Sequence, residues 1–146
     1  MSVEPSEVAR KLRYGWALPK RIGPWSLTEL GNDLAEYTAE VEIGYSRRIA
    51  KVRMSRSVFR YNILIFPSYD KTWRITARIR GPRDRRNAAA GLIGLLEGMA
   101  DVKDVRRVLQ RIVELSASDF PTYRAGRYKS VGEFLETFHL NGKRHV

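Results

Sequence analysis

Apolar residues recur at helical spacing in the first third of the chain. Residues 6–13 predict a short helix, and residues 14–25 form a connector that contains aromatic residues and proline. Ser26 and Glu29 then match a capping box, in which each side chain bonds the backbone N–H of the other residue. The apolar residues that follow at spacings of three and four are Leu27, Leu30, Leu34 and Tyr37. This spacing predicts a second helix that ends at about Glu36.

From residue 38 the pattern changes to an alternation of apolar and polar positions, which is the period of a half-buried β-strand. Four such runs lie at 38–45, 49–54, 58–66 and 73–80, with short turns between them. Strands this close together along a chain pair most simply as consecutive hairpins. We therefore expect a four-stranded antiparallel meander.

The helical period returns after a basic turn at residues 83–86. Residues 87–100 predict a helix rich in small residues, and residues 101–116 a more strongly amphipathic one. A loop then leads to a short last helix capped by Ser130 and Glu133. The pattern as a whole predicts an α+β fold with two N-terminal helices, a four-stranded antiparallel meander and C-terminal helices.

A chain of 146 residues fits one domain with its own hydrophobic core. We expect residues 1–86 to carry the binding surface, and residues 87–146 to complete the core and to oligomerise. No apolar run is long enough to cross a bilayer, so we expect no membrane association. The start of the chain is acidic and lacks an apolar signal segment, which favours a cytoplasmic protein.

The net charge of +11 is concentrated in one block of the sequence. Thirteen of the 27 Lys and Arg residues, but only two of the 16 acids, lie between residues 46 and 86. Concentrated positive charge works against the compact state through self-repulsion, so it calls for a reason. The commonest reason is a polyanionic partner, usually a nucleic acid.

The alternation assigns this charge to one face of the predicted sheet. Polar residues share that face with no acid among them: Lys51, Arg53, Arg60, Asn62, Arg74, Arg78 and Arg80. Phe66 adds an apolar patch, and Arg47 and Arg48 extend the charge along the preceding strand. Phe59 and Tyr61 fall on the opposite face, under the helices. A basic face chosen only for solubility is the alternative, but solubility is served by mixed charges.

Aromatic residues in the N-terminal connector suggest a second kind of contact. Trp16 and Trp25 could stack on unpaired bases at the rim of a basic groove. The alternative is that both indoles are buried and pin the connector to the sheet. A basic groove bordered by aromatic residues is typical of proteins that bind single strands.

The residues that most enzymes and metal sites need are missing from the sequence. There is no Cys, and His139 and His145 lack ligand spacing to a pair of carboxylates. Asp70 and Asp84, the acids of the basic block, fall in turns, where Asp normally bonds the backbone. We therefore expect no catalytic residues, no metal and no cofactor.

The layout resembles that of the ThermoDBP family, which comprises single-stranded DNA-binding proteins and their relatives from hyperthermophilic archaea. The resemblance covers about residues 5–116 and depends on the connector at 14–25, the Arg-rich meander at 47–80 and the helix at 101–116. It implies a cleft for single-stranded DNA with an apolar floor and basic edges, and oligomers formed through C-terminal helices. The Cys-free, Arg-rich composition is also typical of thermophilic proteins.

Three functions remain open from the sequence. The leading hypothesis is a non-catalytic protein that binds single-stranded DNA with little sequence preference. The second is a basic protein that binds RNA or the ribosome, because stacking and phosphate contacts serve both nucleic acids. The third is a protein-interaction module. The apolar stripe with Val105 and Leu109 could complete the core of one chain. Two features favour sharing it with a second copy: the small residues of 87–100 allow a second helix to approach closely, and Phe134, Leu135 and Phe138 supply more apolar surface than one small sheet can cover. We therefore also expect a homodimer through residues 87–138.

Overall fold

The structure is a computed structural model that describes residues 17–66, 76–118 and 124–140. The strands within these ranges are β1 (Arg21–Ile22), β2 (Trp25–Leu30), β3 (Leu34–Ile43), β4 (Ser46–Arg56), β5 (Tyr61–Phe66), β6 (Thr76–Arg80) and β7 (Arg124–Tyr128). The helices are α2 (Arg85–Gly98), α3 (Val102–Ser118) and α4 (Val131–Thr137). No helix in these ranges has the length and apolar character needed to cross a membrane.

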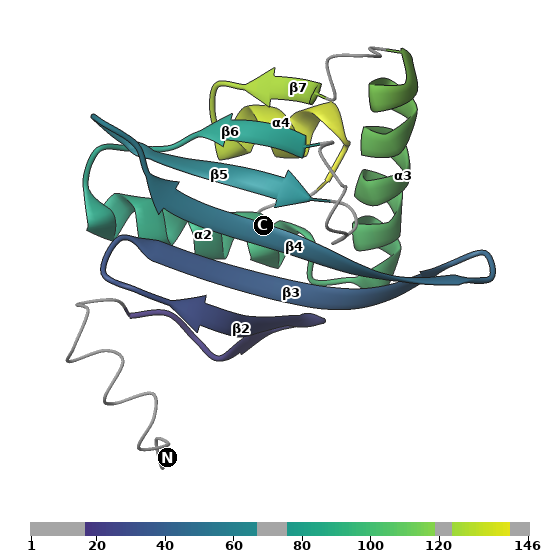
Figure 1. The fold of residues 1–146 in the computed structure, drawn as a ribbon, viewed down its shortest axis with the longest axis horizontal. Helices are drawn as coiled ribbons and strands as arrows, with labels where there is room; N and C mark the ends of the chain where they lie inside the picture. Colours follow the sequence, from purple (N-terminus) through teal and green to yellow (C-terminus); the bar gives the residue numbers. More distant parts are fainter. Residues whose placement is uncertain (1–16, 67–75, 119–123, 141–146) are drawn as a thin grey trace.

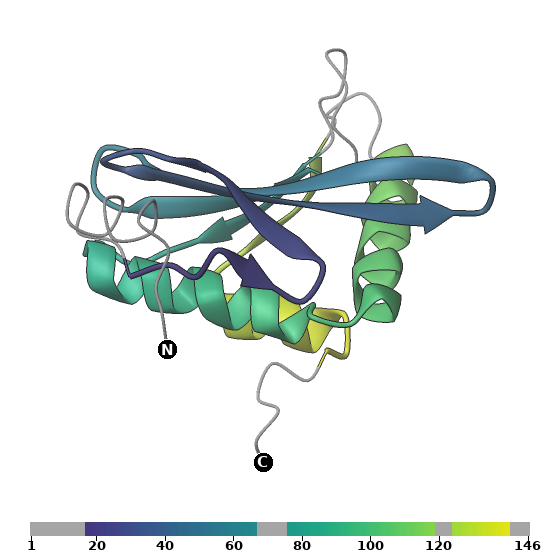
Figure 2. The ribbon, with the colours of Figure 1, turned by 90° about the horizontal axis from the view of Figure 1, so that it is seen from below.

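All seven strands belong to one sheet, whose order follows the order of the chain. Strands β1 to β6 form an antiparallel meander, and β7 pairs in parallel with β6. A parallel pair needs a long crossover connection, which α2 and α3 supply. The three helices lie on one side of the sheet (Figures 1 and 2), and we call the other side the open face.

The fold class expected from the sequence is wrong. The described chain forms a seven-stranded mixed sheet with three helices, all of which follow β6 in the sequence. The expected helix at 6–13 lies outside the described residues. The expected second helix is instead β2, a turn and the start of β3, where Ser26 pairs with Thr38 and caps no helix.

A β-bulge explains the misleading spacing. Leu27 pairs with Tyr37 and Leu30 with Ala35, so β2 uses one residue more than β3 over the same length. The extra residue, Thr28, lets Leu27 and Leu30 both pack against the core although they are three positions apart. A bulged strand therefore imitates the i, i+3 spacing of a helix.

Alternation along the central strands builds the core. Val52 and Met54 of β4 pair with Ile65 and Ile63 of β5, and all four side chains are buried. Trp25, at the start of β2, is also fully buried, and its Nε1 donates a hydrogen bond to the backbone oxygen of Met99, 3.0 Å away. This contact ties β2 to the end of α2.

The helices begin at polar caps and bury one stripe each. Asp84 caps α2 by accepting from the backbone N–H of Asn87 at 3.0 Å, and Ser130 caps α4 by accepting from that of Glu133 at 3.1 Å. The cap that the sequence predicts at Ser130 is confirmed. The residues that α2 and α3 bury are Ala88, Leu92, Leu95, Leu96, Val105, Val108, Leu109 and Ile112. Phe134 of α4 and Phe138, the C-cap residue of that helix, pack against Tyr128 of β7.

These contacts bear on one of the two reasons for expecting a homodimer, the surplus of apolar surface on the C-terminal helices. Phe134, Leu135 and Phe138, the residues that the sequence gives as surplus apolar surface, are buried within the single chain. Val105 and Leu109 are buried there too, as the alternative of a monomer core predicts. Val102, at the start of α3, is partly exposed. The homodimer through residues 87–138 stays a prediction.

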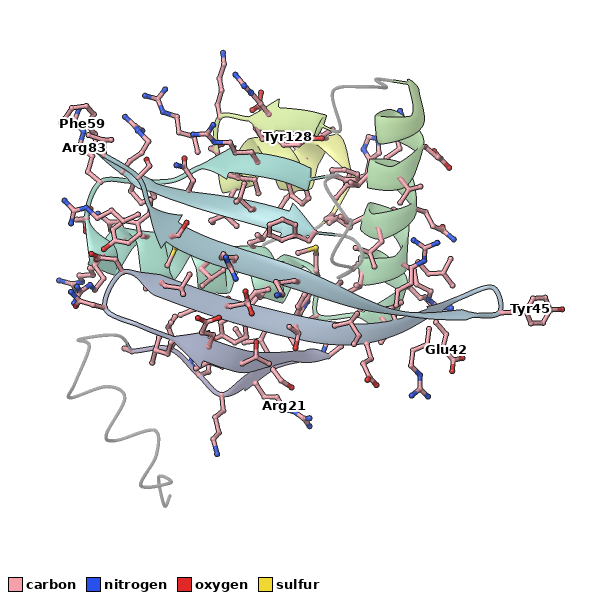
Figure 3. All side chains as sticks on the ribbon, viewed as in Figure 1. Arg21, Glu42, Tyr45, Phe59, Arg83 and Tyr128 are labelled. Carbon is pink, nitrogen blue, oxygen red and sulfur yellow. The ribbon has the colours of Figure 1, made fainter. Side chains whose placement is uncertain are left out.

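Two turns depend on glycine. Gly23, between β1 and β2, has φ of 55°, and a Cβ there would lie 2.5 Å from the backbone oxygen of Ala100. Gly44, with φ of 62°, starts the tight turn between β3 and β4, as in hairpins whose first central residue has positive φ. The β3–β4 hairpin extends beyond α3 as an arm, with Tyr45 at its tip (Figures 1 and 3).

A polar network joins the β2–β3 turn to β5 and α2. Asp33 accepts a hydrogen bond from the Tyr61 hydroxyl at 2.7 Å and one from Nη2 of Arg85 at 3.4 Å. Nη2 of Arg85 also donates to Oδ1 of Asn32 at 2.9 Å. The Tyr61 hydrogen bond, together with Arg85 and the charge of Arg56, lowers the pKa of Asp33.

This network predicts a pH-dependent contribution to stability. Because the folded pKa of Asp33 is depressed, its contribution is present above the unfolded value near 3.8 and is lost as the pH falls through the folded value. We expect Asp33→Asn to lower the free energy of unfolding by about 1 kcal/mol at pH 7, since the side chain is partly exposed, and by less at pH 3. Urea unfolding at both pH values measures this, with Glu40→Gln, at an exposed position of β3, as the control. An equal loss at both pH values would contradict the assignment.

Candidate nucleic-acid interface

The open face of the sheet carries acids on β2 and β3 and cations without acids on β5 and β6. We call Glu29, Glu36, Glu40 and Glu42, which lie on β2 and β3, the acidic flank. Register places Glu42 opposite Arg47 and Glu36 opposite Arg53. Beyond β4, the open-face positions of β5 and β6 carry Asn62, Arg78 and Arg80 but no acid.

Glu36 pairs with two of the cations of β4. Its Oε1 accepts a hydrogen bond from Nε of Arg53 at 2.9 Å, and its Oε2 lies 3.4 Å from Nζ of Lys51. Glu36 is only 5% exposed, so the solvent screens these pairs less than it screens surface pairs. Lys51 and Arg53 are on the open face, as the alternation predicts, but the carboxylate of Glu36 balances part of their charge.

The cations around β5, β6 and β7 line a pocket of about 570 Å³, which we call the basic pocket. Its walls come from the β4–β5 turn, β5, β6 and the end of β7: Ser57, Val58, Phe59, Arg60, Asn62, Arg78, Arg80, Arg127, Tyr128 and Lys129. Five of these ten residues are cations and none is an acid. The volume lies within the range of about 300–1,000 Å³ that is usual for ligand pockets.

The cations of the basic pocket are held close enough to oppose one another. Nη1 of Arg60 donates to the backbone oxygen of Gly81 at 3.4 Å, which holds its guanidinium beside the end of β6. Partial burial, and then the charges of Arg80 and Arg83, lower the pKa of Arg60. The guanidinium stays charged at neutral pH, because arginine does not deprotonate in proteins. An anion placed here would relieve this repulsion.

Two apolar side chains stand at the rim of the basic pocket. Val58 and Phe59 form the tip of the β4–β5 turn, which is closed by the backbone N–H of Ser57 donating to the oxygen of Arg60 at 2.7 Å. Phe59 is 74% exposed and lies at the same corner of the molecule as Arg83 (Figure 3). The prediction that Phe59 packs under the helices is wrong, because the turn ends the alternation before β5 begins.

A second pocket, of about 450 Å³, adjoins the first. Arg60, Arg80 and Lys129 line both pockets, and Gly81 with Val131 continues the second toward α4. These three cations, from the β4–β5 turn, the end of β6 and the residue after β7, therefore form a wall shared by both pockets. An extended anionic ligand could contact both sides of this wall.

The structure brings together only some of the predicted site residues. Arg60, Asn62, Arg78 and Arg80 line the basic pocket, and partly exposed Phe66 lies opposite Lys51 on the open face. Arg47 is exposed on the β3–β4 arm, and Arg48 lies opposite Val41, on the other face of the arm.

Of the two tryptophans predicted to stack on bases, the structure describes only Trp25. Trp25 is buried with its Nε1–H bonded to Met99, so a base cannot stack on it in this structure. Its interpretation as a core residue, the alternative left open by the sequence, is the one the structure supports. Trp16 and Arg74 lie outside the described residues.

Sequence reasoning missed Phe59, Arg127 and Lys129. Residues 118–129 read as a loop, whereas Arg124–Tyr128 forms β7 and pairs in parallel with β6, with Arg127 opposite Arg78. Arg127 and Tyr128 do follow the alternation of a strand, but the segment is too short for its pattern to stand out. Its partner strand lies more than 40 positions earlier in the sequence.

Comparisons of the chain with protein-family models, with curated proteins and with solved structures find no match. The resemblance to the ThermoDBP family therefore stays a prediction. Within the described ranges, no group of three or more His, Cys, Asp or Glu side chains could hold a metal ion.

Proposed function

We propose that the protein binds single-stranded nucleic acid, with DNA as the leading candidate, across β5, β6 and β7. The observation that carries this proposal is the convergence of Arg60, Arg78, Arg80, Arg127 and Lys129 on one pocket without an acid in its walls. Guanidinium groups bind phosphate through paired N–H donors, and phosphate contacts supply most of the affinity of such proteins.

The charge pattern of the open face limits where the strand can lie. The acidic flank repels phosphates, and Glu36 balances part of the charge of Lys51 and Arg53. The favourable surface is therefore a strip over β5 to β7, about 10 Å wide at the usual spacing of neighbouring strands. A basic strip of this width favours a single strand of nucleic acid over the wider duplex.

Exposed apolar side chains favour unpaired bases over a duplex. Phe59 offers a ring at the rim of the basic pocket, and Val58 extends that surface. Base–aromatic stacking contributes on the order of 1–3 kcal/mol per base and tolerates any sequence. A duplex hides its base faces and could use only the cations.

The first test of this proposal is the salt dependence of binding. Four or five phosphate contacts at about −0.7 each give a slope of log affinity against log salt near −3. We expect the double variant Arg78→Gln/Arg127→Gln to reduce the steepness of the slope by about 1.4, because two phosphate contacts are lost. Titration of a labelled single-stranded oligonucleotide at several salt concentrations measures this.

The matched control for the salt test is Arg106→Gln/Arg107→Gln, which removes two exposed cations from α3. Its slope should equal that of the unchanged protein. Equal slopes for both double variants would remove the basic pocket from the interface. Competition with duplex DNA and with single-stranded and structured RNA identifies the preferred strand, and tighter binding of structured RNA would overturn the assignment to single-stranded DNA.

The second test concerns stacking at the rim. We expect Phe59→Ala to weaken single-strand binding by roughly ten- to a hundredfold while leaving the salt slope unchanged, because a stacked base is not a neutralised charge. Tyr45→Ala, at the exposed tip of the β3–β4 arm, is the control and should bind normally. If Phe59→Ala binds like the unchanged protein, the rim makes no contact with bases.

A further inference from the structure

One polar side chain in the basic pocket lacks the partner that its burial demands. Asn62 is only 7% exposed, and its Oδ1 is buried without a hydrogen-bond donor among the described residues. An unsatisfied buried acceptor costs about 1–3 kcal/mol of stability. The residue is the second of β5 and lies on the open face, opposite Arg80 and Ser55.

The missing partner must be a hydrogen-bond donor. Phosphate groups in a nucleic-acid strand accept hydrogen bonds and do not donate them, so phosphate cannot satisfy Oδ1 of Asn62. The guanidinium groups around it are suited to phosphate instead. The edges of nucleobases carry N–H donors, and asparagine is one of the side chains that read such edges.

The pocket provides the other features that a single base needs. Its volume of about 570 Å³ exceeds what a phosphate requires, and Val58 and Phe59 supply an apolar wall at its entrance. Arg60, Arg78 and Arg80 surround the Asn62 position from β6 and the β4–β5 turn. An unstacked base in this pocket would have cations on both sides for its flanking phosphates.

We propose that the basic pocket receives one unstacked base of the bound strand, and that Asn62 accepts a hydrogen bond from the edge of that base. This inference rests on the proposed function, because it needs a bound single strand. It makes Asn62 a base-contacting residue, whereas the surrounding arginines bind phosphates and carry no information about the base.

The experiment uses Asn62→Leu, which keeps the size of the side chain and removes its polar atoms. Since the orphaned acceptor disappears, we expect thermal stability to stay equal or rise. We expect the affinity for a single-stranded oligonucleotide to fall about three- to tenfold with no change in salt slope, because no charge is removed. Thr38→Val, a similar polar-to-apolar change on the open face of β3, is the control and should bind normally.

A second set of oligonucleotides identifies the group that Asn62 contacts. An oligonucleotide built from abasic residues keeps the phosphates and lacks the bases. The unchanged protein and Asn62→Leu should bind this oligonucleotide equally, so that the effect of the substitution appears only when bases are present. An Asn62→Leu effect that persists on the abasic strand, or that appears with RNA but not with DNA, would place the contact on the backbone or the 2′-hydroxyl and overturn the inference.

Failure of the inference is distinguishable from failure of the proposed function. If the unchanged protein binds no oligonucleotide at low salt, the proposed function falls, and the inference falls with it. If the oligonucleotide binds with a steep salt slope and Asn62→Leu binds as tightly as the unchanged protein, only the inference is overturned.

Discussion

The register between β3 and β4 decides which charges the open face of the sheet retains. It places Glu36 opposite Arg53, where its carboxylate reaches both Arg53 and Lys51. A slip of one residue would turn every side chain of β4 to the other face, exposing Val52 and burying Lys51. Glu36 balances part of the charge of Lys51 and Arg53, whereas the pocket lining on β5, β6 and the end of β7 contains cations and no acid. The pairing of β3 with β4 therefore leaves the basic pocket as the part of the open face where cations lie without a neighbouring acid.

One face of the sheet supplies the core, and the other face carries the proposed binding site. Helices α2, α3 and α4 cover one face with buried apolar residues. The hydrogen bond from Trp25 to the backbone oxygen of Met99 joins β2 to the end of α2. The open face does not have to supply the core, so its cations can remain close together near Arg60 in spite of their repulsion. Asn62, on the open face, also reduces stability, because its side-chain carbonyl is buried without a hydrogen bond. Residues that break the rules of a stable fold are expected at functional sites.

Much of the sheet and of the C-terminal helices could be predicted from local pattern. The alternation through Val52, Ile63 and Ile79 identifies strands and faces correctly, because one buried face imposes the period of two. The N-terminal error has a specific cause: the bulge at Thr28 gives β2 a helical spacing, and Ser26 with Glu29 imitates a cap. Strand β7 could not be predicted, since its parallel partner is distant in the sequence. For the site, the pattern finds Arg78 and Arg80 but cannot show that Glu36 balances Lys51 and Arg53, which depends on pairing between strands.

The measurement that tests the central claim most directly is an NMR titration of the ¹⁵N-labelled protein with a short single-stranded DNA. If the strand lies over β5, β6 and β7, the amide shifts should change at Phe59, Asn62 and Arg127 and stay constant at Glu40 and Tyr45. Changes centred on the β3–β4 arm or on the exposed side of α3, with none around the basic pocket, would contradict it.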